Sequence, residues 1–246
     1  MAATTTPVTK AVNHLELDTE PLQEEPYVLR MPAATDVEEQ NHHEPPVTDR
    51  VAHLHLLPGQ GHGVDLDRAA GAVADLLDAL GVDRNADGLE ETPARVAKAL
   101  AEMLTPEPFE VTTFANDEGY DELVVARAIP FASLCEHHLL PFSGFAYVGY
   151  LPDERLVGLS KLARVVDHFS RRLQVQERLT AQIANYLQST LQPKGVGVVL
   201  EAEHLCMSLR GVRSGGSRTV TSALKGLVRD DPRTRSEFLS LAGTHG

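Results

Sequence analysis

Two strand-like segments separated by a short turn constrain the fold of this chain more than any other feature. Residues 122–134 read ELVVARAIPFASL and residues 143–151 read SGFAYVGYL, and both are rich in the β-branched and aromatic residues that strands favour. A second pair of such segments follows, at residues 195–212 (GVGVVLEAEHLCMSLRGV) and 217–226 (SRTVTSALKG). The sequence therefore predicts a sheet assembled from two strand pairs.

Apolar residues at helical spacing precede the first strand pair. Residues 64–82 (VDLDRAAGAVADLLDALGV) place them on one face of a helix, and Gly81 is a typical helix stop. Residues 91–104 (ETPARVAKALAEML) predict a second helix, with Thr92 as its N-cap and Pro93 at its first position. We therefore expect two helices at the start of the ordered region.

Two further helices are predicted between the strand pairs. Residues 160–173 (SKLARVVDHFSRRL) begin with Ser160 as a cap, and residues 176–191 (QERLTAQIANYLQSTL) are followed by Pro193, which ends the helix. A short final helix is predicted at residues 232–242 (PRTRSEFLSLA). Helices, a strand pair, a helix pair and a second strand pair together indicate an α+β fold with an antiparallel sheet.

The first 62 residues have a different composition from the rest of the chain. They alternate Pro, Thr, Glu and His without sustained periodicity, and they hold ten Asp or Glu, three Lys or Arg and six of the eleven histidines. Such a segment cannot bury enough apolar surface to offset its ordering entropy. We expect residues 1–62 to be a disordered acidic, histidine-containing tail and residues 63–246 to be the folded domain.

Composition argues against several classes of protein. The N-terminus lacks the apolar region of a signal peptide, no apolar run could span a membrane, and two distant cysteines make no disulfide framework. We therefore expect a soluble cytoplasmic protein without a membrane partner. The net charge of −13 also argues against a nucleic-acid partner.

One stretch of the chain reverses this acidic balance. Residues 160–218 carry nine Lys or Arg against four Asp or Glu. A basic segment in an acidic protein suggests a small polyanion, such as a phosphorylated metabolite. The alternative is that each of these cations only solvates a helix face.

The two cysteines each lie close to histidine. Cys135 and His138 have C-x-x-H spacing in the turn between the first two strands, where both side chains can face one ion. On a strand, alternate residues share a face, so His204 and Cys206 are predicted to project together. Cys135, His138 and Cys206 would give zinc two thiolates and one imidazole and leave a fourth position open, the arrangement of catalytic zinc.

Several alternatives to this site stay open. Buried cysteines are often inert small hydrophobic residues, His137 could bind the metal in place of His138, and a closed structural site with four ligands is conceivable. In the catalytic interpretation, the metal lowers the pKa of bound water. His137 and His204 are then the candidate proton carriers, because histidine titrates near neutral pH.

Residues that could hold phosphate gather at a predicted helix start. Ser160, Lys161 and Arg164 occupy the first turns, where unpaired N–H groups and the helix dipole favour an anion. The alternative is a capping serine with two surface cations. Arg210 follows Cys206 by four residues, so a continuing strand would place its guanidinium on the same face, near the metal.

The next predicted helix begins with Gln176 and Glu177. The Glu177 carboxylate could simply complement the helix dipole. It could also accept a pair of N–H donors from a purine or pterin ring.

Taken together, these segments resemble GTP cyclohydrolase I. The resemblance rests on CEHHLLPFSG, GYLP, GLSKLARVVDHFSRRLQVQERLT, GVGVVLEAEHLCMSLRGV, TVTSALKG and DPRTRSEFL, in that order, and it runs from about Asp65 to Ala242. It implies a tunnelling fold, an antiparallel sheet backed by two helices, with a helical hairpin and linker at 63–120 and the core at 121–246. It also implies a ring-shaped homodecamer with active sites at subunit interfaces.

The resemblance implies a reaction and a role for each candidate residue. GTP and water would give 7,8-dihydroneopterin triphosphate and formate, the first step of pterin and folate biosynthesis, with zinc as the cofactor. The residues implied are Cys135, His138 and Cys206 for zinc, His137 and His204 for protons, Glu177 with Gln176 for the guanine edge, and Ser160, Lys161, Arg164, Arg210 and another subunit's Arg95 for the triphosphate. The rival interpretations are a different tunnelling-fold enzyme acting on a pterin or deazapurine, and a non-catalytic assembly protein with structural zinc.

Overall fold

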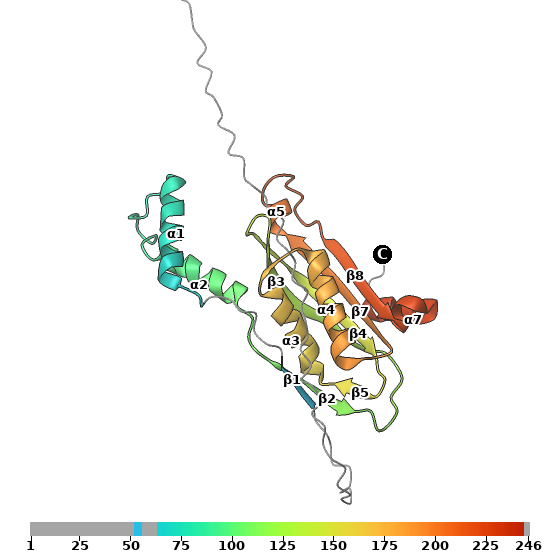
Figure 1. Cartoon of the computed structure of the whole chain (residues 1–246). Helices are drawn as coiled ribbons and strands as arrows, with labels where there is room; N and C mark the ends of the chain where they lie inside the picture. The colour runs from blue at the N-terminus through green and yellow to red at the C-terminus, as the bar shows by residue number, and fades with distance from the viewer. Residues whose placement is uncertain (1–51, 56–62, 244–246) are drawn as a thin grey trace, which may run out of the picture. The chain divides into compact units, whose positions relative to one another are not determined.

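A five-stranded sheet organises the computed structural model, which describes residues 52–55 and 63–243 (Figure 1). The strand order is β6-β3-β4-β7-β8. All neighbours are antiparallel except β6, which adds to β3 in parallel. The strands are β3 (Val124–Cys135), β4 (Pro141–Leu151), β6 (Leu173–Gln174), β7 (Gly195–His204) and β8 (Thr219–Gly226). The two predicted strand pairs are confirmed, and they join through β4 and β7.

Two helices cover one face of this sheet, α3 (Leu159–Ser170) and α4 (Gln176–Leu191) (Figure 1). Alternate residues of β7, Val196 and Val198 among them, are fully buried in the same cluster as Ile183 of α4. Every second residue of the strand and the inward-facing residues of the covering helices thus pack together in one aliphatic core. The predicted α+β architecture, a sheet backed by two helices, is confirmed.

The opposite face of the sheet receives the C-terminal helix α7 (Pro232–Ala242), which follows the short α6 (Leu227–Asp230). Phe238 of α7 is fully buried against this face. A Cβ atom built on Gly197 would lie 2.5 Å from the Phe238 ring, so β7 needs glycine where the aromatic ring approaches. The predicted final helix is confirmed.

The two N-terminal helices are α1 (Leu66–Ala79) and α2 (Thr92–Leu104), which pack on each other. Gly81 has a φ of 76°, the left-handed conformation that ends a helix and favours glycine. The predicted N-cap at Thr92 is wrong by one residue. Glu91 O accepts the first intrahelical bond, from Arg95 N–H at 3.0 Å, so Glu91 is the cap and Thr92 is the first residue of the helix.

The predicted cap at the start of α3 is also displaced. Gly158 is the N-cap, and its carbonyl accepts from Lys161 N–H at 2.8 Å. Ser160 is therefore the second residue of the helix rather than its cap. It is exposed.

A second, small sheet has the order β1-β2-β5, formed by β1 (Ala52–His55), β2 (Glu110–Ala115) and β5 (Arg155–Val157). The sequence predicts neither β2 nor β5, and it places residues 52–55 in a disordered tail. At these four residues the expectation is wrong, because β1 pairs with β2, a partner more than fifty residues away. The remaining residues of 1–62 lie outside the described part of the chain.

The strand predicted at residues 195–212 ends early. β7 stops at His204, and a single helical turn, α5 (Leu205–Ser208), follows. Leu209 N–H bonds to Leu205 O, and Ser214 N–H bonds to Met207 O, so the chain turns back on itself at this point. Within the described residues, no helix combines the length and apolarity needed to cross a membrane.

Candidate active site

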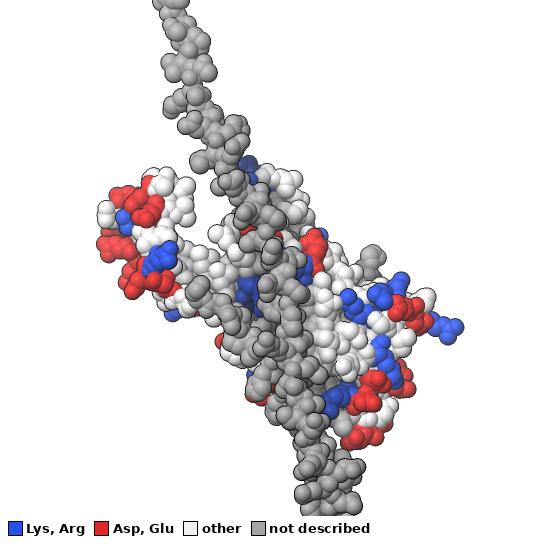
Figure 2. Space-filling model, in the orientation of Figure 1, with Lys and Arg blue, Asp and Glu red and all other residues white. Residues whose placement is uncertain are grey.

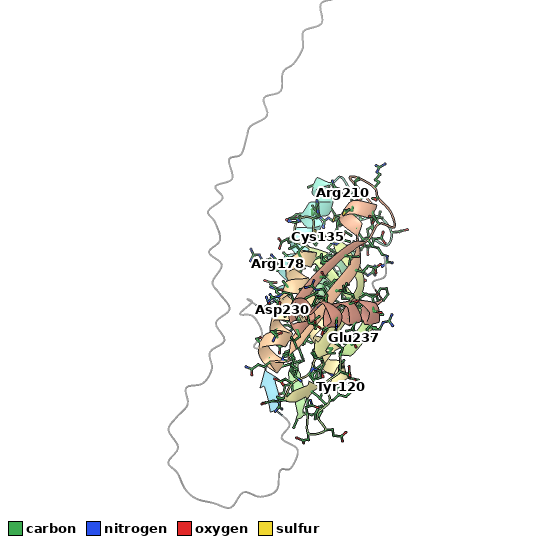
Figure 3. All side chains as sticks on the ribbon, turned by 90° about the vertical axis from the view of Figure 1, so that its right-hand side faces the viewer. Tyr120, Cys135, Arg178, Arg210, Asp230 and Glu237 are labelled. Atoms are coloured by element: carbon green, nitrogen blue, oxygen red, sulfur yellow. The ribbon has the colours of Figure 1, made fainter. Side chains whose placement is uncertain are left out.

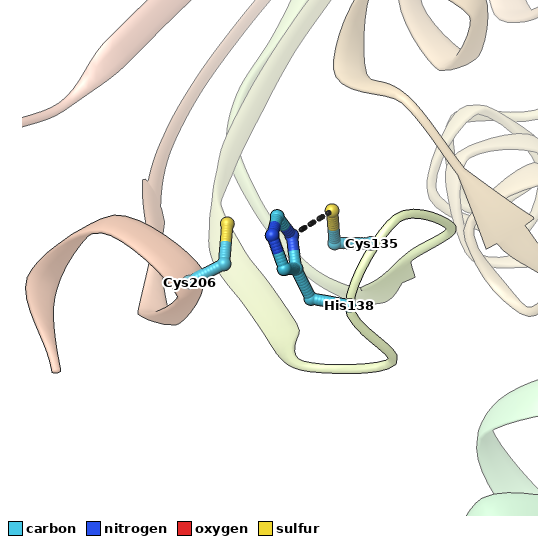
Figure 4. A group of neighbouring side chains, drawn as sticks. All are labelled: Cys135, His138 and Cys206. Carbon is cyan, nitrogen blue, oxygen red and sulfur yellow. Dashed lines mark hydrogen bonds between the residues drawn. The ribbon is translucent and has the colours of Figure 1, made fainter. Parts of the chain in front are cut away.

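Three potential metal ligands meet at one end of the sheet. Cys135 is the last residue of β3, His138 lies in the turn that follows, and Cys206 lies in α5. Their ligand atoms all lie within 4.8 Å of one another, and Cys135 Sγ is 3.7 Å from His138 Nδ1 (Figure 4). The structure thus brings together the three residues that the sequence predicts as ligands.

The turn after β3 explains why C-x-x-H spacing works at this position. The N–H groups of His138 and Leu139 both bond to Cys135 O, which curls the chain so that His138 faces back toward Cys135. Leu139 completes the turn with a φ of 55°. This conformation is costly for a residue with a side chain, and such strain is often found at functional sites.

Cys206 is positioned by a different structural element from the predicted one. Because β7 ends at His204, the two residues do not share a strand face, and the prediction based on strand alternation is wrong. The helical turn of α5 turns Cys206 toward Cys135 instead (Figure 4). Arg210, predicted on the same continuing strand, lies exposed just after α5. Figure 3 shows Arg210 and Cys135 toward the same end of the molecule.

The electrostatics of this cluster favour a cation. Burial raises the pKa of the Cys206 thiol, and the neighbouring Cys135 raises that pKa further. Two thiols this close cannot both ionise easily on their own, whereas a bound divalent ion stabilises both thiolates. Two sulfur ligands and one imidazole suit zinc and do not suit magnesium or calcium, which prefer oxygen. Among the described residues, this is the one group of three or more Cys, His, Asp or Glu side chains with such close ligand atoms.

His137 lies in the same turn and keeps 64% of its side chain exposed. Its Nδ1 is 3.9 Å from Cys135 Sγ, and its Nε2 is 3.9 Å from a carboxylate oxygen of Glu136. The hydrogen bond from Arg178 lowers the pKa of Glu136, so a carboxylate stands beside His137. Sequence reasoning missed this pair. The geometry favours His138 over His137 as the metal ligand.

His204 is fixed beside the cluster by two contacts. Its ring stacks on Phe142, with centroids 4.6 Å apart and planes 2° apart, and its Nε2 lies 2.7 Å from Gln176 Oε1. Burial lowers the pKa of His204, while the negative charge of Glu177 acts in the opposite direction. The strand pattern of β4 predicts that Phe142 is buried, but nothing in the sequence reveals that it stacks on His204.

The start of α4 adjoins His204. Glu177 is exposed there and accessible to a ligand. Gln176 is only 2% exposed, and both polar atoms of its side chain are bonded within the protein. The structure therefore gives the Gln176 side chain different partners from the guanine edge that the sequence analysis expects.

The remaining predicted substrate residues lie elsewhere in the single chain. Ser160, Lys161 and Arg164 are at the start of α3, where Gly158 N–H bonds to Thr112 O of the small sheet. The other end of α3 leads into β6, which pairs with Cys135, so about 18 Å of helix separates the two ends. Arg95 is exposed on α2, and its guanidinium pairs with Glu91 at 2.6 Å.

The fold and this cluster define an α+β protein with three grouped side chains that could hold a metal ion. The family model for GTP cyclohydrolase I matches residues 69–243, well over half of the chain. A relative named GTP cyclohydrolase 1 from Sulfurihydrogenibium sp. (strain YO3AOP1) is 52% identical over 182 residues, which cover 74% of this chain and 97% of the relative. Another of that name from Aquifex aeolicus (strain VF5) is 51% identical over 178 residues, covering 72% and 97%. The chain belongs to the GTP cyclohydrolase I family, a family of enzymes whose activity it shares.

A solved structure also matches part of the chain. The crystal structure of the archaeosine synthase QueF-Like in the apo form covers 44% of this chain and 94% of that chain, with a TM-score of 0.34 and 16% identity. This similarity is too low to support any conclusion about the present fold or site.

Proposed function

We propose that the chain carries out the GTP cyclohydrolase I reaction with zinc held by Cys135, His138 and Cys206. GTP and water give 7,8-dihydroneopterin triphosphate and formate. The observation that supports this most is the grouping of two thiols and one imidazole within 4.8 Å, in a chain that belongs to this family. Three protein ligands leave one position of a tetrahedral ion open to a small molecule.

A zinc ion held by these residues would supply Lewis acidity, which would lower the pKa of a water molecule and make hydroxide available near neutral pH. The protein's part is to hold the two thiolates and the imidazole in place. The turn at Leu139 fixes His138, and α5 fixes Cys206. Both cysteines are free thiols in the structure, in keeping with the cytoplasmic location that we also propose.

His204 and His137 are the proposed proton carriers, and their surroundings suit different steps. His204 is half-buried, and its lowered pKa leaves it neutral and able to accept a proton. His137 is exposed beside the Glu136 carboxylate, which can stabilise an imidazolium. A half-buried acceptor can take the proton that the attacking water loses, and an exposed donor can supply the proton that a ring nitrogen gains, as water adds to C8 and the imidazole ring of GTP opens.

Glu177 is the proposed anchor for the guanine edge. It lies exposed at the start of α4, close enough to His204 for its charge to act on that ring. A carboxylate can accept two parallel N–H bonds from a guanine. Such a pair would hold the base beside His204 and the metal ligands.

Triphosphate binding requires residues that one chain does not bring together. Arg210 lies near the metal ligands, and within the described residues it forms no ion pair. Ser160, Lys161 and Arg164 lie at the far end of α3, so we propose that a second copy of the chain supplies them. Arg95 would come from another copy as well.

The exposed apolar surface supports such an assembly, which we propose is a homodecamer. No residue of α1 is buried in the single chain, and Leu66, Leu76 and Leu80 are 45%, 56% and 69% exposed. Exposed leucines on one helix face favour burial against another copy. On the face shown in Figure 2, basic and acidic side chains are interspersed over the α1–α2 hairpin and around α7, which does not favour a nucleic-acid partner.

The decisive experiment incubates the purified full chain with GTP and measures formate and dihydroneopterin triphosphate, with and without a zinc chelator. We expect stoichiometric formation of both products, loss of both with chelator, and recovery when zinc is restored. Bound zinc without product would instead support the non-catalytic alternative.

A further inference from the structure

A buried hydrogen-bond network lies behind His204 and ends at Gln176. We infer that Gln176 is a positioning residue that fixes which nitrogen of His204 carries the hydrogen, and that Thr221 of β8 holds Gln176 in place. This inference rests on the proposed role of His204 in proton transfer. In this positioning role, Gln176 needs no contact with GTP.

The orientation of the Gln176 amide follows from its partners. Nε2 lies 3.1 Å from Leu200 O and 3.0 Å from Thr219 O, and it lies 3.1 Å from Thr221 Oγ1. Backbone carbonyls can only accept hydrogen bonds, so the atom facing them must be the NH₂ group. Oε1 is thereby directed to the other side, toward His204.

The hydrogen on His204 follows from the orientation of the amide. Gln176 Oε1 can only accept, so the 2.7 Å contact requires an N–H on His204 Nε2. In the neutral ring, Nδ1 then carries the lone pair. The stack on Phe142, which is fully buried, keeps the ring from rotating out of this bond.

Two threonines fix which group donates and which accepts in the hydrogen bonds of this network. Thr180 Oγ1 donates to Gln176 O at 2.7 Å, which uses its one hydrogen. The 2.7 Å contact between Thr180 and Thr221 must therefore run from Thr221 O–H to Thr180 Oγ1. Thr221 keeps its oxygen lone pairs for the Gln176 amide. Gln176 and Thr180 are nearly fully buried, so water does not compete for these bonds.

The consequence for the reaction is a fixed orientation of the His204 ring. The bond from Nε2–H to Gln176 and the stack on Phe142 together hold the ring in one position, with the Nδ1 lone pair free. Without the amide oxygen, the ring can hold its hydrogen on either nitrogen and can rotate. Only the fraction with a free Nδ1 lone pair in the right place then reacts.

The test uses Gln176→Met, which keeps a similar volume but cannot accept from His204. We expect kcat to fall by about tenfold to a hundredfold, with KM for GTP and zinc content within about twofold of the parent. Thr221→Val should lower kcat in the same way but by less, about threefold to tenfold, the worth of one hydrogen bond. Thr221→Ser, which restores the hydroxyl, should recover most of the rate.

Ser222→Ala is the matched control, because Ser222 follows Thr221 on β8 and is exposed on the opposite face. It should not change kcat or KM. If Gln176→Met raises KM and leaves kcat unchanged, Gln176 binds the substrate directly and the inference is wrong. The inference is equally wrong if kcat is unchanged in both Gln176→Met and Thr221→Val.

A double-mutant cycle separates this inference from the role of His204 itself. In a His204→Ala background, adding Gln176→Met should not lower the residual rate further, since there is no ring left to position. An additional tenfold loss there would show that Gln176 acts independently. If His204→Ala alone keeps the full rate, the proposed proton role of His204 fails, and the inference fails with it.

Discussion

Phe142 and His204 lie ring on ring, 4.6 Å between centroids and 2° from parallel, where β4 pairs with β7. Phe142 belongs to the buried core, and His204 lies at the end of the sheet that holds the proposed metal ligands. The contact therefore links the stability of the core to the position of the proposed proton carrier.

Phe142→Ala should weaken both properties at once. Phe142 is fully buried, so its truncation is expected to lower the free energy of unfolding by about 3–5 kcal/mol, measured by denaturant titration. Turnover at temperatures where the variant is folded should also fall, because His204 loses its stacking partner. Phe145→Ala is the control on the same strand. Phe145 is 40% exposed on the other face of the sheet, and its loss should cost less than about 1 kcal/mol and leave turnover unchanged.

Cys206→Ala should abolish formate release and zinc binding while leaving GTP binding partly intact. The variant removes one of the three proposed ligands, and Cys135 and His138 alone should not hold the ion tightly. Metal analysis, a formate assay and calorimetry with GTP measure the three quantities. Normal turnover by a metal-free Cys206→Ala protein would contradict the zinc mechanism.

Subunit mixing tests whether each active site is shared between copies. Lys161→Ala and Cys206→Ala should each be nearly inactive alone, since one lacks a phosphate contact and the other the metal. If the start of α3 serves a neighbouring copy, co-assembly of the two variants creates some sites with both parts intact. Activity should then reappear in the mixture. A mixed assembly that stays inactive would place both residues in the same chain's site.

The buried His168 should make stability depend on pH. Burial lowers its pKa, Arg172 adds to this, and its Nδ1 has no hydrogen-bond partner in the described structure. The folded state therefore favours the neutral ring, and this contribution to stability is complete above the ordinary value of 6.5 and is lost as pH falls below it.

His168→Leu removes this titration, so its free energy of unfolding should change less between pH 7.5 and 5 than that of the parent. Urea titrations at several pH values measure this difference. A parallel pH dependence in both proteins would contradict the assignment. Metal analysis of both proteins at each pH separates any effect of metal loss from the titration of His168, which lies in the last turn of α3.

The sequence predicts well where a single local pattern decides the structure. The β-branched runs at β3 and β4 have strong local signals, and both strands are found. The C-x-x-H pair is a weak signal on its own and gains weight only from the second cysteine, which the structure brings close to it. β2 and β5 are short, and each gains order from a partner about forty residues away, which no local window contains.

The errors near the active site have a similar origin. Nothing in EAEHLCMSLRG marks the end of a strand, and the helical turn at α5 arises from backbone bonds such as Leu209 N–H to Leu205 O. The sequence therefore predicts Cys206 as a candidate ligand through a strand geometry that the structure does not have. The partners of Gln176 lie on β7 and β8, which follow it by more than twenty residues, so its burial is not visible in its own neighbourhood.

β6 is only two residues long, yet it connects the two halves of the active site. Cys135 pairs with Gln174, and Glu136 N–H bonds to Gln174 O, so the metal side of the site is fastened to the segment between α3 and α4. Two residues further on, Gln176 holds His204. A displacement of this segment would move Cys135, a proposed metal ligand, together with Gln176, the partner of the proposed proton carrier. The distance between the two proposed functional groups thus depends on a stretch of three residues, from Gln174 to Gln176.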